Sequence, residues 1–91
     1  MPRPRNRRRL RFQASVHYFK PAGVPLRELE EVVVAKDEIE ALKHYHHDGL
    51  DQKAAAAEMA ISQPTFARTI KRTQAKIADA LINGKAIRLE D

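Results

Sequence analysis

The feature that most constrains the fold is a short alanine-rich segment, followed after a three-residue break by a long amphipathic one. Asp51 and Ser62 precede these segments and are residue types that cap helix N-termini, while Gly84 suits a helix end. Six side chains of the long segment recur at the spacing of one helix face: Phe66, Ile70, Thr73, Ile77, Ala80 and Leu81. The sequence therefore predicts helices near 51–59 and 63–82.

A third helix is predicted just upstream, over residues 37–47. Asp37 followed by Glu40 has the spacing of a capping box, in which each end satisfies an amide of the first turn. Ile39 and Leu42 then begin a helical apolar face, and Asp48-Gly49 is a typical helix end.

The remaining segments favour extended structure. Residues 12–25 combine aromatic and β-branched side chains with a turn-rich connector, and residues 86–89 alternate as in a short edge strand. Residues 26–34 fit either a helix or a strand, because helical spacing competes with three consecutive valines. The expected fold is mainly α, with one or two short strands. We divide the chain into a flexible arginine-rich arm (1–11), an extended, turn-rich segment (12–36), and a helical domain with a short C-terminal tail (37–91).

The two helices predicted at 51–59 and 63–82 fit a helix-turn-helix. Ala55-Ala56 allows two helices to cross closely, Met59 and Ile61 can plug the turn, and Phe66 can anchor the second helix. With Phe66 facing inward, the side chains of Ala67, Arg68, Lys71 and Arg72 project outward at 100° per residue.

An exposed helix of this kind fits the major groove of DNA, where its early residues reach base edges. Gln63 can pair with adenine, Arg68 with guanine, and Ala67 can contact a thymine methyl. Phosphate contacts are expected further along the helix and at the start of the preceding one. The predicted DNA-binding residues of the two helices are Gln52, Ser62, Gln63, Thr65, Ala67, Arg68, Lys71, Arg72 and Lys76.

Positive charge is confined to two parts of the chain. Residues 1–11 hold six arginines and no acid, and residues 62–83 hold four basic residues against one acid. The intervening residues 28–58 carry a net charge of −6, and two basic elements flanking an acidic scaffold suit a polyanion held at two places. The arm is expected on phosphates or in a minor groove through Arg3, Arg5, Arg7, Arg8 and Arg9. Alternatively, it pairs with the chain's own Glu28, Glu30 and Glu31.

Several motifs together resemble known bacterial proteins. Residues 37–68 resemble the helix-turn-helix of sigma factor region four. The residues that carry this resemblance are Asp37-Glu38-Ile39-Glu40-Ala41-Leu42, Gly49-Leu50-Asp51-Gln52, Ala55-Ala56, Met59, Ser62, Pro64-Thr65-Phe66 and Arg68. Nearly the whole chain resembles an uncharacterised prokaryotic family, domain of unknown function one hundred and thirty-four, through Met1-Pro2-Arg3-Pro4-Arg5, Arg7-Arg8-Arg9, Phe19-Lys20-Pro21-Ala22-Gly23-Val24-Pro25-Leu26 and Asn83-Gly84-Lys85-Ala86. The resemblance implies a DNA-binding protein with a sigma-like helix-turn-helix.

The chain departs from the sigma pattern at a few positions. Ala60 stands where the turn usually has glycine, so a left-handed conformation there would cost about 1 kcal/mol. Ala54 replaces the usual glutamate of a capping box, and Thr69 and Thr73 occupy places that are more often apolar.

The sequence gives little support for an enzymatic function or a metal site. The chain has no cysteine, which excludes disulfides and thiolate sites and is consistent with a reducing cytoplasm. His44 and Asp48 could face one ion from successive helical turns, but two such ligands make a weak site. With three glycines and no phosphate loop, no nucleotide fingerprint fits. We expect no enzyme, no cofactor and no metal.

Three functions compete. The first is sequence-specific binding of double-stranded DNA by a cytoplasmic, nucleoid-associated transcriptional regulator. The others are RNA binding through the arm and a protein-interaction module that docks on the transcription machinery through residues 28–58. A homodimer is hypothesised through the second half of the long helix and the segments 12–19 and 86–89, because the helix has more apolar residues than one small core needs. No membrane association is expected, since no apolar run approaches the length of a span.

Overall fold

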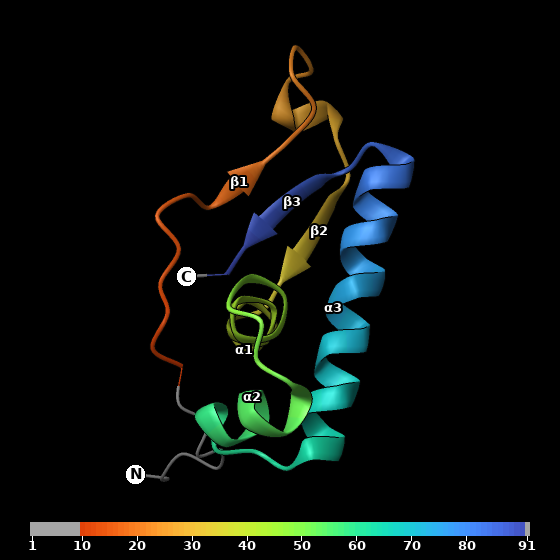
Figure 1. Cartoon of the computed structure of the whole chain (residues 1–91). Coiled ribbons are helices and arrows are strands. Elements are labelled where there is room, and N and C mark those ends of the chain that lie inside the picture. The colour runs from red at the N-terminus through yellow and green to blue at the C-terminus, as the bar shows by residue number, and fades with distance from the viewer. Residues whose placement is uncertain (1–9, 91) are drawn as a thin grey trace, which may run out of the picture.

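The computed structural model describes residues 10–90 and is mainly helical, as predicted. Within that range the α-helices are α1 (Lys36–Leu42), α2 (Gln52–Met59) and α3 (Gln63–Asn83), and the strands are β1 (Tyr18–Phe19), β2 (Glu31–Val34) and β3 (Ala86–Leu89) (Figure 1). A 3₁₀ turn, η1 (Leu26–Glu28), precedes β2, and a π-helical turn, η2 (Lys43–His47), continues α1. The predicted DNA contacts of the arm, Arg3, Arg5, Arg7, Arg8 and Arg9, lie outside the described residues.

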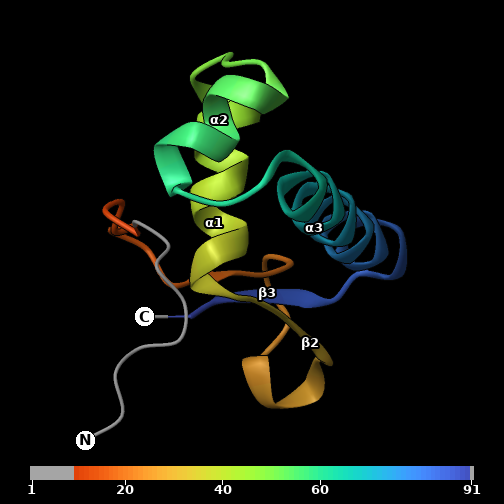
Figure 2. The same cartoon turned by 90° about the horizontal axis from the view of Figure 1, so that it is seen from below.

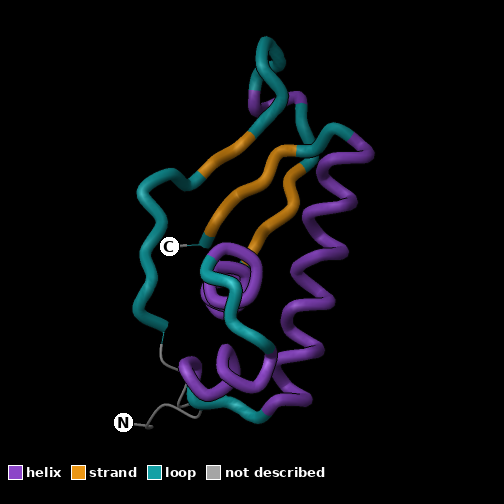
Figure 3. Tube along the Cα trace, in the orientation of Figure 1, coloured by secondary structure: helices purple, strands orange, loops and turns teal. Residues whose placement is uncertain are grey.

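The described strands form one sheet in the order β1-β3-β2 (Figures 1 and 3). β3 runs antiparallel to β1, with Phe19 opposite Ile87, and parallel to β2, with Val32 opposite Ile87. The prediction that residues 86–89 form an edge strand is therefore wrong, because β3 is the central strand. Alternation shows which face of a strand is buried but does not show how many neighbours it has.

The segment left open between helix and strand contains both. Residues 26–28 make the single turn η1, and residues 31–34 form β2, in which Val32 and Val34 are buried. The branched valine side chains favour the pleated, half-buried setting of a sheet. The sheet has three strands where one or two were expected.

The start of α1 differs from the predicted capping box. The helix begins at Lys36, and Glu38 Oε1 accepts a hydrogen bond of 2.8 Å from the N–H of Ala35. The Ala35 side chain has no acceptor, so the reciprocal bond of a capping box is missing. The prediction of a capping box between Asp37 and Glu40 is therefore wrong. Glu40 Oε1 instead accepts a hydrogen bond of 2.9 Å from the N–H of Phe12, 28 residues away.

The other predicted helix signals are confirmed. Asp51 Oδ1 accepts the N–H of Ala54 at 2.8 Å, and Ser62 Oγ accepts the N–H of Thr65 at 3.2 Å. Gly49 and Gly84 end their helical segments with φ of 80° and 66°, a left-handed conformation that glycine adopts without steric cost.

The main core lies where α1, α2 and α3 meet. Its buried residues are Ala41, Ala55, Ala56, Met59, Phe66 and Ile70. Figure 2 shows α1 running from the sheet to α2, with α3 alongside. The buried hydroxyls of Thr69 and Thr73 donate to the carbonyls of Thr65 and Thr69 at 2.9 and 2.8 Å, so these polar side chains are satisfied within α3.

One member of the predicted buried stripe is strongly exposed. Leu81 is 73% exposed, although Ala80 beside it is buried. Successive residues of a helix differ by 100°, so Leu81 turns away from the surface that covers Ala80. Among residues 10–90, no helix has the length and apolar character needed to cross a membrane.

Candidate nucleic-acid interface

The turn between α2 and α3 is short and tightly bonded. Ala60 takes a left-handed conformation, with φ 57° and ψ 43°, as expected for the position that usually holds glycine. The N–H of Ala60 donates to Ala57 O and that of Ile61 to Ala56 O, both at 3.1 Å. These bonds satisfy two carbonyls of the last turn of α2 and help to offset the strain of about 1 kcal/mol at Ala60.

The residues predicted to join the two helices are buried together. Ala55 and Met59 of α2 have no exposed surface, and neither does Phe66 of α3. Ala56 is 3% exposed, and the half-buried Ile61 packs against the same cluster from within the turn. Small side chains let α2 approach the start of α3 closely, so α2 fixes the direction in which α3 begins.

The first turns of α3 present several of the predicted DNA-binding residues to solvent. Ser62, Gln63, Arg68 and Lys71 are exposed, and Thr65, Ala67 and Gln52 are half-buried. Thr65 Oγ1 accepts hydrogen bonds from Ser62 Oγ at 2.8 Å and from Arg68 Nη2 at 3.3 Å. Arg68 is thereby directed toward the beginning of α3, with most of its guanidinium donors still available.

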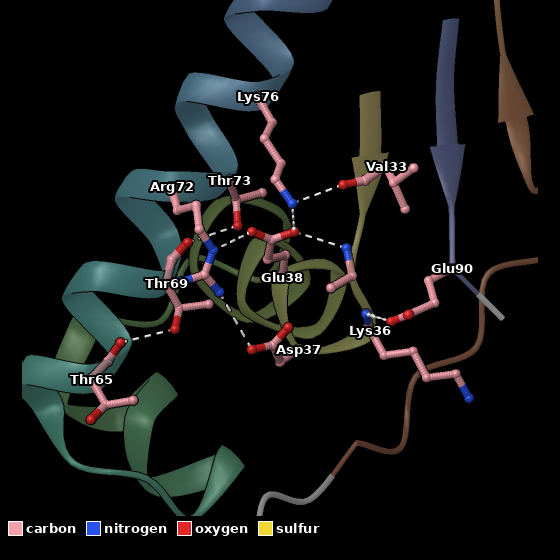
Figure 4. Close-up of polar contacts among 11 residues, drawn as sticks. Val33, Lys36, Asp37, Glu38, Thr65, Thr69, Arg72, Thr73, Lys76 and Glu90 are labelled. Atoms are coloured by element: carbon pink, nitrogen blue, oxygen red, sulfur yellow. Dashed lines mark hydrogen bonds and ion pairs between the residues drawn. The ribbon is translucent and has the colours of Figure 1, made fainter. Parts of the chain in front are cut away.

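Arg72 and Lys76, which were predicted to bind phosphates, have a partner inside the protein (Figure 4). Arg72 Nε donates to Glu38 Oε2 at 2.6 Å, and Lys76 Nζ donates to Glu38 Oε1 at 2.7 Å and to Val33 O at 2.8 Å. Arg72 Nη2 also lies 3.6 Å from Asp37 Oδ2. The structure thus separates these two cations from Arg68 and Lys71, because they face α1 and the end of β2.

The carboxylate at the centre of this cluster is fully buried. Burial tends to raise the pKa of Glu38, but hydrogen bonds from Lys76, the N–H of Ala35 and Arg72 outweigh it and hold the pKa below its ordinary value. Glu38 therefore stays ionised and clamps the middle of α3 to the start of α1. The sequence did not single out Glu38, since its partners lie 34 and 38 residues away.

The histidine-rich turn at η2 forms a second polar cluster. His44 Nε2 lies 2.9 Å from Glu40 Oε2. Asp48 Oδ2 accepts a hydrogen bond from Lys43 Nζ at 2.7 Å, and Asp48 Oδ1 lies 2.8 Å from His47 Nδ1. Hydrogen bonds from Lys43 and then His47 lower the pKa of Asp48 to about 2. In the part of the chain that the structure describes, no group of three or more potential ligands could hold a metal ion.

The N-terminal strap, residues 10–17, leads toward the end of the molecule that holds α2 and the start of α3 (Figure 1). From β1 it passes beside α1 (Figure 1), and its Arg11 lines a small pocket together with Glu58 of α2. It is attached at Phe12, whose N–H binds Glu40 and whose ring lies 5.7 Å from the Lys43 ammonium. The described chain thus begins near the end of the protein that holds α2.

These elements define a small, mainly helical domain with a three-stranded sheet. The chain belongs to the family described as Protein of unknown function DUF134, which it matches over residues 1–91. The predicted family resemblance is thus confirmed. No solved structure matches the chain.

Relatives named UPF0251 protein occur in several bacteria. The chain is 56% identical to the one from Moorella thermoacetica over 90 residues, which are 99% of this chain and 60% of that protein. It is 50% identical to the one from Caldanaerobacter subterraneus, again over 99% of this chain and over 76% of that protein. The chain thus spans less than two thirds of the Moorella relative.

Proposed function

We propose that the protein binds double-stranded DNA in a sequence-specific manner and acts as a transcriptional regulator. The observation that carries this proposal is the arrangement of α2 and α3. A short helix, a left-handed turn and a Ser-capped long helix share a core, and the outer side of the long helix begins with exposed Gln63, Arg68 and Lys71. This arrangement supports a helix-turn-helix of the sigma region-four type, with residues 63–72 as the recognition helix in the major groove.

The contacts divide into two kinds. Gln63, Ala67 and Arg68 occupy the first turns and are assigned to base edges, whereas Lys71 is assigned to a phosphate. Gln52, at the start of α2, is half-buried and is assigned to a phosphate through its amide or side chain. Ser62 and Thr65 hold the helix start, and Thr65 also orients Arg68.

The phosphate roles first assigned to Arg72 and Lys76 are changed in this proposal. Each is bonded to Glu38, so drawing it to DNA would leave a buried carboxylate with one fewer cation. We assign both to holding α3 at its angle to α1. The Arg72 side chain is 51% exposed and can add a long-range attraction to DNA without leaving Glu38.

The first prediction compares two exposed cations of α3. Arg68→Ala should weaken binding to the preferred site by about 1–3 kcal/mol and relax discrimination at one base position. Lys71→Ala should weaken binding to all DNA sequences alike, because a contact to a phosphate does not distinguish between bases. Fluorescence anisotropy on the preferred duplex and on single-base variants measures both effects.

Arg27→Ala is the matched control, because it removes one positive charge from an exposed site in η1, at the far end of the molecule (Figure 1). The affinity of this variant for DNA should stay within about twofold of that of the parent, because salt screens the interaction of DNA with a charge that lies far from the contact. If Lys71→Ala changed specificity while Arg68→Ala did not, the two assigned roles would be reversed.

The proposal itself is tested by random-site selection on duplex DNA, with single-stranded RNA of the same length as competitor. Enrichment of a defined motif that RNA does not displace supports it. Preferential binding to RNA favours recognition through the arm, and no nucleic-acid binding favours docking on the transcription machinery. The proposed role requires no catalytic group and places the protein on the nucleoid in the cytoplasm.

A further inference from the structure

An apolar groove lies between the strap, the sheet, α1 and α3. Its volume is about 620 Å³, and the side chains that line it come from every one of these elements. The main apolar ones are Phe12, Phe19, Leu42, Ile77, Ile87 and Leu89. The groove borders the core formed by α1, α2 and α3, because Leu42 packs against that core and also lines the groove. Its walls include residues that remain only half-buried.

The same side of the molecule carries an apolar ridge. Leu81 follows Ile77 by four residues on α3, so it lies one turn further along the side of the helix that faces the groove. Leu81 is 73% exposed, and on the opposite wall Phe12 and Phe19 are 43% and 54% exposed. A hollow and a projecting leucine therefore lie next to each other on one surface.

We infer that this surface is a homodimer interface, in which Leu81 of each copy enters the groove of the other. A two-fold axis brings identical patches together, so a patch must be complementary to itself, and a ridge beside a groove meets that condition. Phe12, Phe19 and Leu81 alone expose on the order of 300 Å². The groove walls add to this, toward the ~800 Å² that each partner of a stable complex buries.

The polar side chains at the groove favour a second copy over a small ligand. Ligand sites are mostly apolar but present a few polar groups that fix the ligand. Here Lys43 and His47 are bonded to Asp48, and His46 is bonded to Gln74 at 2.7 Å. These polar groups each have a partner within the protein, and the exposed lining of the groove is mostly apolar.

The segments that form this surface are the ones for which the sequence suggested a dimer. Residues 12–19 and 86–89 both line the groove. The second half of α3 supplies Ile77 to the lining and the exposed Leu81 to the ridge. The inference does not depend on DNA binding. Where both hold, the dimer carries two recognition helices, and the selected DNA motif should consist of two half-sites.

Sedimentation of two adjacent variants tests the interface. Leu81→Glu should raise the dimer dissociation constant at least about tenfold, because it places a charge in a buried apolar contact. Ile82→Glu is the matched control, since Ile82 is 81% exposed and lies 100° further round α3, away from the groove. Its dissociation constant should stay within about threefold of the parent.

Circular dichroism should show the same helix content in all three proteins, because neither side chain belongs to the core. A parent chain that is monomeric at about 100 µM would overturn the inference. So would an equal or larger effect of Ile82→Glu, which would place the contact on the outer face of α3.

Disulfide trapping gives an independent test, because the chain has no cysteine of its own. Leu81→Cys and Ala14→Cys are prepared as separate proteins, mixed and oxidised; Ala14 lines the groove. The mixed disulfide between the two variants should form faster than with Ile82→Cys in place of Leu81→Cys. Equal rates would show that Leu81 does not enter the partner's groove, and the ridge-and-groove contact would be wrong.

Discussion

Glu38→Ala is expected to lower the free energy of unfolding by about 3 kcal/mol. The carboxylate is fully buried and accepts hydrogen bonds from the N–H of Ala35, from Arg72 and from Lys76. Its removal leaves a cavity, an amide without its partner and two cations that must return to water. Urea denaturation at neutral pH, followed by circular dichroism, measures the change.

Glu58→Ala is the control, because Glu58 is an exposed carboxylate on α2 and its loss should change stability by less than about 0.5 kcal/mol. Arg72→Ala should be destabilising but less so than Glu38→Ala, since Lys76 still compensates the buried charge. A Glu38→Ala protein as stable as its parent would show that the cluster contributes nothing to the fold.

The contribution of Glu38 should also depend on pH. Its pKa is lowered in the folded protein from an ordinary value of 4.5, so its stabilisation is complete above that value. It is lost as the pH falls through the lower folded pKa, where the carboxylate takes up a proton. The difference in unfolding free energy between the parent and Glu38→Ala should therefore be larger at pH 7 than at pH 3.

The parts of this fold that the sequence predicts are those set by neighbouring residues. The caps at Asp51 and Ser62 bind amides three residues away, and Ala60 and Gly84 end helices through their own backbone angles. The start of α3, with Arg68 on its exposed side, follows from such local signals. Local sequence signals therefore locate most of the candidate interface.

The parts that the sequence does not predict depend on residues far apart in the chain. β3 is central because β1 and β2, from the other end of the chain, both pair with it. The bonds of Arg72 and Lys76 to Glu38 join residues that lie 34 and 38 positions apart, so no local pattern indicates them. Leu81 follows the helical period of a buried face, but no element within residues 10–90 covers it.

Deletion of residues 1–9 should weaken DNA binding about a hundredfold at physiological salt. These residues hold five of the six arginines of the arm: Arg3, Arg5, Arg7, Arg8 and Arg9. Each phosphate neutralised adds about 0.9 to the salt dependence of log K, so three engaged arginines contribute a slope of roughly 3. The effect on discrimination between sequences should be smaller, because contacts to phosphates carry no base code.

The truncation is chosen so that the fold is not disturbed. It leaves Phe12 and its hydrogen bond to Glu40, so the strap keeps its attachment to α1. The alternative, in which the arm pairs with the chain's own Glu28, Glu30 and Glu31, predicts a different outcome. Glu31 already binds Arg88 at 3.2 Å, and Glu30 lies 3.5 Å from Lys85. These ion pairs partly neutralise the two carboxylates and weaken their attraction for the arm.

Affinity measured at several salt concentrations, for the full and truncated chains, separates the two arrangements. A slope that falls by roughly 3, with an unchanged melting temperature, places the arm on DNA phosphates. A lower melting temperature with an unchanged slope places it on the protein's own carboxylates and refutes the DNA-bound arm. Replacement of the five arginines by lysine, which keeps the charge, should preserve most of the slope, because counterion release depends on charge and not on the shape of the donor.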